Sequence, residues 1–150
     1  MKTAEQFLKE HNNPVISVSP GTAIKEALQI MTERNIGSIL IKESGKVVGI
    51  WTERDLMRNV LQPGFNIETA LIKDFMTTRL HYAEHDDILW RLNDKFLGLR
   101  IRHLLVRKNG EFIGMISSGD VSKYELNEKM AELNDLNHKI SWEYYENWRW

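Results

Sequence analysis

The stretch Gly49-Ile50-Trp51-Thr52-Glu53-Arg54-Asp55 decides the fold, because a close copy, Gly114-Met115-Ile116-Ser117-Ser118-Gly119-Asp120, follows sixty-five residues later. Each copy has a hydroxyl three residues after its glycine and a carboxylate three residues after the hydroxyl. An apolar run precedes each copy and a helix-like run follows it, which is typical of a strand that turns into a capped helix. Because a repeat period is a property of a whole fold, the two copies predict an internal repeat.

Both turns also carry groups that can bind a ligand. Free backbone N–H groups in the first turn of a helix attract an anion such as phosphate. A carboxylate just inside the helix can accept two hydrogen bonds from a diol such as a ribose. The alternative is structural: the hydroxyls of Thr52 and Ser117 cap their helices, and Asp55 and Asp120 interact with the helix macrodipole, worth about 0.3–1 kcal/mol.

The composition narrows the classes of partner. The chain has 150 residues, a net charge of -1 and no cysteine. The balanced charge argues against nucleic acid as a partner, and the missing thiols exclude disulfides and thiolate metal sites. No apolar run approaches the roughly 20 residues that span a bilayer, so we expect no membrane partner and a cytoplasmic location.

Outward from the two turns, the pattern divides the chain into five segments. We expect a lead-in helix in residues 1–13, a first repeat in 14–62, a linker in 63–76, a second repeat in 77–124 and an amphipathic C-terminal helix in 125–150. Each repeat has the pattern strand, helix, strand, strand, helix, and neither is large enough to bury its sheet alone. The predicted fold is therefore α/β, of the α+β type, with two pseudo-symmetric repeats that share a core.

The sequence also predicts how the helices begin. Thr3 with Gln6 forms a capping-box pattern, Thr22 is the expected N-cap of the first repeat's helix, and Asp86 or Asp87 that of the second. Ile24 and Ile88 are sixty-four residues apart rather than sixty-five, so we expect one extra residue near positions 97–98.

The C-terminal segment is longer than the repeat requires. Apolar residues and one Asn recur there in steps of four and three, at Leu126, Met130, Leu133, Asn137, Ile140 and Tyr144, as in a coiled-coil seam. Its aromatic residues are Trp142, Tyr144, Tyr145, Trp148 and Trp150. Because acidic residues outnumber basic ones from residue 122 onward, we expect these rings to pack against a second subunit in a homodimer rather than on nucleic-acid bases.

With both repeats laid out, residues 14 to 124 resemble the cystathionine beta-synthase (CBS) domain family, as a tandem pair or Bateman module. The resemblance rests on the two turns and on three further runs: Ile-Ser-Val-Ser-Pro-Gly-Thr from Ile16 to Thr22, Ile-Gly-Ser-Ile-Leu-Ile from Ile36 to Ile41, and Ile-Arg-His-Leu-Leu-Val from Ile101 to Val106. It implies a regulatory module, not an enzyme, that often forms a flat dimer. The implied ligand is AMP, ADP, ATP or S-adenosylmethionine, bound in one or both clefts between the repeats, with no obligatory cofactor.

The resemblance also implies which residues line each cleft. One cleft would use Asp120 for the ribose hydroxyls and Ser117 and His103 toward the phosphate, with Val15, Ile16, Ile36, Gly37 and Ser38 around the adenine. The other would use Asp55, Thr52, Leu80, His81, Ile101, Arg102 and Ser38, with Arg54 or Arg102 near the phosphate. We favour the Asp120 cleft, because His81-Tyr82 and a Glu84 in place of Pro20 are expected to crowd the Asp55 cleft.

Two functions remain open. In the first, the chain is a sensor that binds an adenosine-containing nucleotide and changes the arrangement of its subunits or its binding to an unidentified target protein. In the second, it is a ligand-free scaffold that dimerises or binds partners through the C-terminal aromatic helix. No nucleophile with a base, and no Gly-rich loop with a Lys, indicates an enzyme. His81 and His85 are expected to belong to a polar loop rather than to a metal site.

Overall fold

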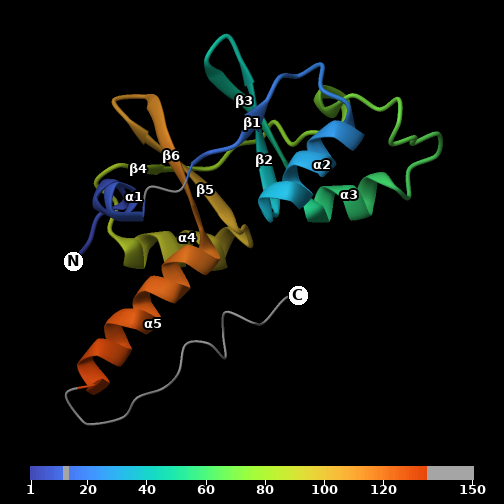
Figure 1. Cartoon of the computed structure of the whole chain (residues 1–150). Coiled ribbons are helices and arrows are strands. Elements are labelled where there is room, and N and C mark those ends of the chain that lie inside the picture. The colour runs from blue at the N-terminus through green and yellow to red at the C-terminus, as the bar shows by residue number, and fades with distance from the viewer. Residues whose placement is uncertain (12–13, 135–150) are drawn as a thin grey trace.

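The computed structural model describes residues 1–11 and 14–134 (Figure 1). Its elements are, in chain order, α1 (Ala4–His11), β1 (Ser17–Val18), α2 (Ile24–Arg34), β2 (Ser38–Glu43), β3 (Lys46–Thr52), α3 (Glu53–Asn59), the 3₁₀ turn η1 (Ile72–Asp74), β4 (Tyr82–Glu84), α4 (Leu89–Leu99), β5 (His103–Lys108), β6 (Glu111–Ser117) and α5 (Ser118–Asn134). The strands form two sheets, β1-β2-β3 and β4-β5-β6. The predicted α+β fold is therefore confirmed.

The two sheets have the same topology and register. In each, the first strand pairs in parallel with the second, and the second pairs antiparallel with the third. Ser38 lies opposite Thr52, and His103 lies opposite Ser117. Both hairpins turn through two residues with positive φ, Ser44-Gly45 and Asn109-Gly110, the geometry that matches the twist of the flanking strands. The internal repeat is therefore present residue by residue at an offset of sixty-five.

The offset also holds for the helices, so the expected extra residue near positions 97–98 is wrong. α2 begins at Ile24 and α4 at Leu89, and the buried residues of α2 (Ile24, Ala27, Met31) match those of α4 (Leu89, Leu92, Phe96). Ile88 corresponds to Ala23 and lies just before the helix. The adjacent apolar residues Ile88 and Leu89 left the start of α4 ambiguous in the sequence. In the structure Leu89 is buried and is the first residue of the helix.

The expected caps Thr22, Asp86 and Asp87 are also wrong. α2 and α4 begin after Ala23 and Ile88, which have extended backbones and no side-chain cap. Instead, the first helical N–H groups bond to backbone carbonyls: Ile24 N donates to Ala70 O at 2.9 Å, and Leu89 N donates to Lys2 O at 3.1 Å. Carbonyl groups of neighbouring backbone segments therefore satisfy the N–H groups that side-chain caps satisfy in other helices.

These neighbouring segments are exchanged between the repeats. α1, with the capping box of Thr3 and Gln6 confirmed, lies on the second repeat, where Ala4 N donates to Asp87 O at 2.8 Å. The linker before the second repeat lies on the first, where Ile72 N donates to Thr22 O at 2.8 Å. Figure 1 shows α1 beside β4, β6 and α4, and the chain then crossing to β1.

The buried side chains form two clusters rather than the single shared core that we expected. One cluster contains Ala4 and Phe7 of α1 with the second repeat, and the other contains Ala70 and Ile72 of the linker with the first. Each repeat therefore completes its core with a segment that precedes the other repeat. α5 projects away from both sheets, and the rest of the predicted C-terminal helix lies outside the described residues (Figure 1).

The exchanged segments explain the glycines of the repeated turns. A Cβ built on Gly114 would lie 2.7 Å from Leu8 Cδ1 of α1, and one built on Gly49 would collide with Met76 Sδ of the linker. Glycine is therefore required at both positions because a side chain from the exchanged segment packs directly on the strand backbone.

We expect Gly114→Ala to lower the free energy of unfolding by about 1–3 kcal/mol, because the added methyl displaces Leu8 from a packed position. Gly98→Ala is the matched control. A Cβ at Gly98 meets nothing within 4 Å, and alanine in a helix should raise stability by about 0.5–1 kcal/mol. Urea unfolding followed by circular dichroism measures both, and equal effects of the two variants would contradict the packing argument.

Glu5 fastens α1 to the second repeat through an ion pair that depends on pH. Lys108 at the end of β5 donates to Glu5 Oε1 at 2.9 Å, and Lys9 lies 2.9 Å from the same oxygen. These hydrogen bonds lower the pKa of Glu5 from 4.5 to about 2. Because the pKa is lower in the folded state, the stabilisation is complete above about pH 4.5 and is lost as the pH falls toward 2.

We therefore expect Glu5→Gln to destabilise the protein at pH 7 and to lose its effect on acidification. Unfolding midpoints in urea at pH 7, 4.5 and 3 measure the difference between variant and wild type. A difference that stays constant over this range would show that the charge of Glu5 is not what fastens α1.

Candidate ligand site between the repeats

A cavity of about 700 Å³ lies between the two repeats. This volume is in the range of about 300–1,000 Å³ that is usual for small-molecule sites. The first repeat contributes the residue before β2, the end of β3 and residues of α3. The second repeat contributes the segment before β4, the segment that leads into β5, and the junction of β6 with α5. The lining residues are Gly37, Ile50, Thr52, Glu53, Arg54, Asp55, Arg58, Thr77, Arg79, Leu80, His81, Arg100, Ile101, Arg102, His103, Leu105, Ser117, Ser118 and Gly119.

The Asp55 turn presents one carboxylate oxygen to this cavity. Thr52 is the N-cap of α3: its Oγ1 accepts from Asp55 N at 3.3 Å, and Asp55 Oδ2 accepts from Thr52 N at 2.9 Å and from Thr52 Oγ1 at 3.0 Å. The structural role that the sequence left open is therefore present. It occupies Oδ2 only, while Oδ1 has Arg58 at 4.0 Å. The cap holds Asp55 in place and leaves Oδ1 able to accept from a ligand.

The Asp120 turn has the same internal bonds. Ser117 Oγ accepts from Asp120 N at 3.1 Å and donates to Asp120 Oδ2 at 2.6 Å. Ser117 lines the cavity but Asp120 does not. The other residues assigned to the Asp120 cleft divide in the same way. Gly37 and His103 line the cavity, whereas Val15, Ile16, Ile36 and Ser38 do not.

By contrast, the cavity brings together almost the whole set that was assigned to the Asp55 cleft. Thr52, Arg54, Asp55, Leu80, His81, Ile101 and Arg102 all line it, and only Ser38 does not. Of the three residues expected to crowd this cleft, only His81 lines the cavity. Tyr82 and Glu84 do not line the cavity, and Glu84 pairs instead with Arg107. With the corrected offset, His85 rather than Glu84 corresponds to Pro20, and His85 lies beside Glu5.

The backbone at the helix starts is already largely paired. Glu53 N donates to Gly37 O at 3.1 Å, and the equivalent Ser118 N donates to Arg102 O at 2.8 Å. Asp55 N and Asp120 N are used by the hydroxyl caps. An anion in this cavity would therefore be bound mainly by side chains rather than by helix N–H groups.

Those side chains are strongly cationic. Five arginines and two carboxylates, Glu53 and Asp55, line the cavity. Arg54 and Arg58 come from α3, Arg79 precedes β4, and Arg100 and Arg102 precede β5. An excess of guanidinium groups in a concave site raises the local concentration of anions such as phosphates.

Of the positions related by the offset of sixty-five, only one carries a positive charge. They are Gly119 for Arg54, Lys123 for Arg58, Pro14 for Arg79, Asn35 for Arg100 and Gly37 for Arg102. Four of the five arginines therefore have an uncharged residue at the related position, so the positive charge is concentrated on the Asp55 side of the pair. Sequence reasoning missed Arg58, Arg79 and Arg100, and the signal that could have found them is the comparison of the two repeats position by position.

His103 lies at the boundary between the two clefts. Burial lowers its pKa, with the charge of Asp120 acting in the opposite direction and Arg102 adding to the lowering. The imidazole is therefore neutral at pH 7 and offers the cavity one N–H donor and one nitrogen acceptor.

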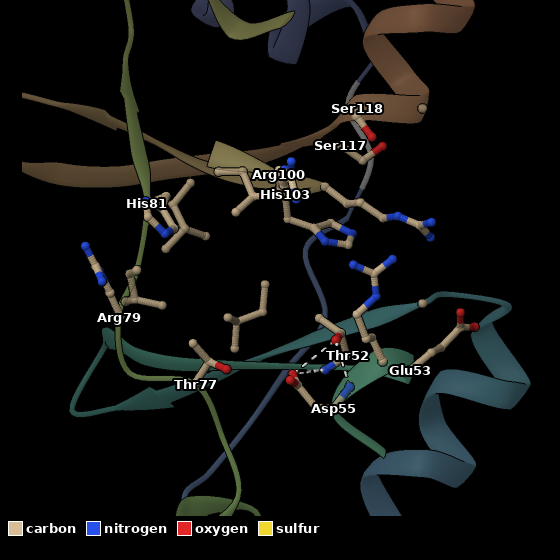
Figure 2. A pocket seen from close by; sticks show the side chains of 18 of the residues that line it. Thr52, Glu53, Asp55, Thr77, Arg79, His81, Arg100, His103, Ser117 and Ser118 are labelled. Atoms are coloured by element: carbon tan, nitrogen blue, oxygen red, sulfur yellow. Dashed lines mark hydrogen bonds between the residues drawn. The ribbon is translucent and has the colours of Figure 1, made fainter. Parts of the chain in front are cut away.

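Figure 2 shows how these walls face one another. Thr52 and Asp55 form one wall, with their mutual hydrogen bonds drawn, and His103, Ser117 and Ser118 lie on the opposite wall. Thr77, Arg79 and His81 close a third side. A ligand in this space would contact both repeats at once.

Two further findings concern the described residues. No three His, Cys, Asp or Glu side chains among residues 1–11 and 14–134 gather closely enough to hold a metal ion. In the same part of the chain, no helix has the length and apolar character needed to cross a membrane.

Comparisons with known proteins agree with this architecture. A family model described as "CBS domain" matches residues 8–62 and again residues 72–127. The CBS domain-containing protein CBSX3, mitochondrial, of Arabidopsis thaliana is 31% identical over 122 residues, which are 78% of this chain and 59% of the relative. The chain thus spans little more than half the length of that relative.

Solved structures show the same fold. The CBS-domain containing protein ATU1752 from Agrobacterium tumefaciens matches with a TM-score of 0.77 and 30% identity, over 83% of this chain and 99% of the other. The CBS domain protein PAE2072 from Pyrobaculum aerophilum, solved in complex with AMP, matches with a TM-score of 0.68 and 22% identity, over 79% of this chain and 89% of the other. Since the family model covers both repeats and their geometry agrees, this chain belongs to the CBS domain family and contains a tandem pair of CBS domains.

Proposed function

We propose that this chain is a regulatory module, not an enzyme, that binds an adenosine-containing nucleotide in the cavity beside the Asp55 turn. The observation that supports this most directly is the cavity itself, in which a pre-positioned carboxylate oxygen and five arginines face one space of about 700 Å³. AMP in the similarly folded PAE2072 supports an adenosine ligand as the occupant.

Each part of such a ligand has a matching group in the cavity. Asp55 Oδ1 would accept from a ribose hydroxyl, because Oδ2 is held by Thr52. Ile50, Leu80, Ile101 and Leu105 supply apolar surface for the base, and the arginines supply donors for the phosphates. We therefore place the ligand in the Asp55 cleft, rather than in the Asp120 cleft that the sequence favoured.

Binding would act on the rest of the molecule through the contacts to both repeats. A ligand shifts a conformational equilibrium only by its difference in affinity for the two states. Since the cavity walls come from both repeats, a change in the relative position of the repeats changes that affinity. We propose that the output is a change in subunit arrangement or in binding to a target protein.

A second copy of the chain is the subunit that we propose. Trp90 and Leu97 lie two turns apart on one face of α4 and are 66% and 81% exposed. Large exposed apolar side chains gathered on one face are typical of an interface. This face therefore supports a homodimer through α4.

One observation favours the alternative of a ligand-free scaffold. The capping boxes account for the bonds that Thr52, Asp55, Ser117 and Asp120 make, without any ligand. In this view the cavity has no function, and the chain acts through the C-terminal aromatic helix, whose aromatic residues lie outside the described residues. Ligand binding decides between the two.

We expect AMP, ADP, ATP or S-adenosylmethionine to stabilise the protein, by about 2.7 kcal/mol at a concentration 100-fold above the Kd. Asp55→Asn should weaken binding at least about tenfold, because the amide can still accept the capping bond but replaces the free carboxylate oxygen with a donor. Asp120→Asn is the matched control and should leave affinity unchanged. Thermal shift and calorimetry measure both.

Two results would contradict the proposal that a nucleotide binds beside the Asp55 turn. Stabilisation by none of the four compounds would favour the scaffold. A loss of affinity in Asp120→Asn but not in Asp55→Asn would place the ligand in the other cleft.

We expect Leu97→Glu to convert the dimer to a monomer, because a buried, unpaired charge at an interface costs several kcal/mol. Ile113→Glu, an exposed substitution on β6, is the control and should leave the mass unchanged. Sedimentation equilibrium measures the mass of each variant. A dimer that survives Leu97→Glu would exclude this face of α4 as the interface.

A further inference from the structure

Arg100 adopts a backbone conformation that its side chain does not favour. It ends α4 in the left-handed region, at φ 55° and ψ 41°. The equivalent residue of the first repeat is Asn35, at φ 53° and ψ 47°. Asparagine visits this region readily, whereas for other residues with a Cβ it is strained. The second repeat therefore retains an arginine where the first has a residue suited to the turn.

Local contacts do not account for this arginine. Arg100 N donates to Phe96 O, a bond that any residue can make. Within the described residues, no carboxylate lies within 4.0 Å of its guanidinium group. The side chain lines the cavity instead. Strained residues that are kept in a fold cluster at ligand sites, so the strain points to a role in the cavity.

The cavity has more positive charge than one phosphate group can balance. Five arginines face two carboxylates there. Arg54, Arg79 and Arg102 resemble Arg100 in having no carboxylate within 4.0 Å among residues 1–11 and 14–134. A phosphate group brings a charge of only about −1.5 to −2 at neutral pH. The arginines of the cavity therefore carry more positive charge than its two carboxylates and one phosphate group neutralise.

The arginines are also distributed around the cavity. Figure 2 shows Arg79 and Arg100 on different walls, and each comes from a different segment of the second repeat. A single phosphate is compact and contacts the guanidinium groups on one side. A phosphate chain extends farther and meets donors on more than one wall.

We propose that Arg100 makes this site selective for a nucleoside triphosphate over the corresponding monophosphate. The proposal rests on the proposed function, because it concerns the same cavity. Arg100 holds the distal end of the phosphate chain, and the strain at its backbone is the cost of that placement. Asp55 and the apolar wall bind the nucleoside, which the two ligands share.

The test is Arg100→Asn, which gives the second repeat the residue of the first. Since asparagine suits the left-handed conformation, the unliganded variant should unfold at a higher temperature than the wild type, so its folding is not in doubt. Its affinity for ATP should fall about tenfold, the effect of one charge-assisted hydrogen bond, while its affinity for AMP stays within about twofold. Calorimetry in EDTA with ATP and with AMP measures both.

Arg91→Asn is the control for a general loss of charge. Arg91 is an exposed residue of α4 that lies 3.9 Å from Asp87 and does not line the cavity. It should change the affinity for neither nucleotide.

The outcomes separate this inference from the proposed function. A wild type that binds AMP as tightly as ATP, or an Arg100→Asn variant that loses both equally or neither, overturns the selectivity and leaves the nucleotide site standing. A wild type that binds neither nucleotide, nor any other adenosine ligand, overturns both.

Discussion

The rest of the structure depends on the exchange of backbone segments between the repeats. Lys2 O accepts the first N–H of α4, and Ala70 O accepts the first N–H of α2. Each bond is accompanied by side chains that complete a core, Phe7 in one repeat and Ile72 in the other. Because neither repeat has a complete core or a satisfied helix start without a segment from outside, the two fold as one unit. The cavity between them follows from that constraint.

The same exchange explains what could be predicted from the sequence and what could not. The two turns, the hairpins and the end of α2 at Asn35 depend on bonds between residues close in the chain, and local chemistry predicts them. Thr22 and Asp87 were expected as caps by the same local rules. They do not cap the helices, because a backbone carbonyl distant in the chain accepts the first N–H group of each helix. Asp87 instead accepts hydrogen bonds from Glu84 N and from Lys95. Although burial opposes ionisation of Asp87 and is the largest single effect, the hydrogen bonds from Lys95 and Glu84 N together with the charges of Lys95 and Arg91 outweigh it and hold the pKa of this carboxyl below its usual value.

The residues of the candidate site also fall into two groups, those that were predicted from the sequence and those that were not. The residues that the two repeats share, such as the hydroxyl and carboxylate of each turn, were predicted because they recur at the same spacing in the sequence. The residues that distinguish the clefts were not, since Arg79 and Arg100 occupy positions where the first repeat has Pro14 and Asn35. Repetition identifies the framework of a pseudo-symmetric site, whereas our proposal for which half binds the ligand rests on the differences between the copies. That comparison requires the correct offset, which the strand registers and the buried faces of α2 and α4 establish.

Capping and ligand binding at Asp55 need not be alternatives. The bonds from Thr52 to Oδ2 fix the carboxylate before any ligand arrives, so a ligand at Oδ1 does not have to order the side chain. α3 is anchored in turn, because Trp51 Nε1 donates to the buried Asn59 Oδ1 at 2.9 Å and ties both ends of the helix region to β3 and the first core. A ligand held by Asp55 is thereby attached to the first repeat, and the same ligand at Ile101 and Arg102 is attached to the second. We propose that the site responds to the relative position of the repeats because each repeat supplies part of its walls.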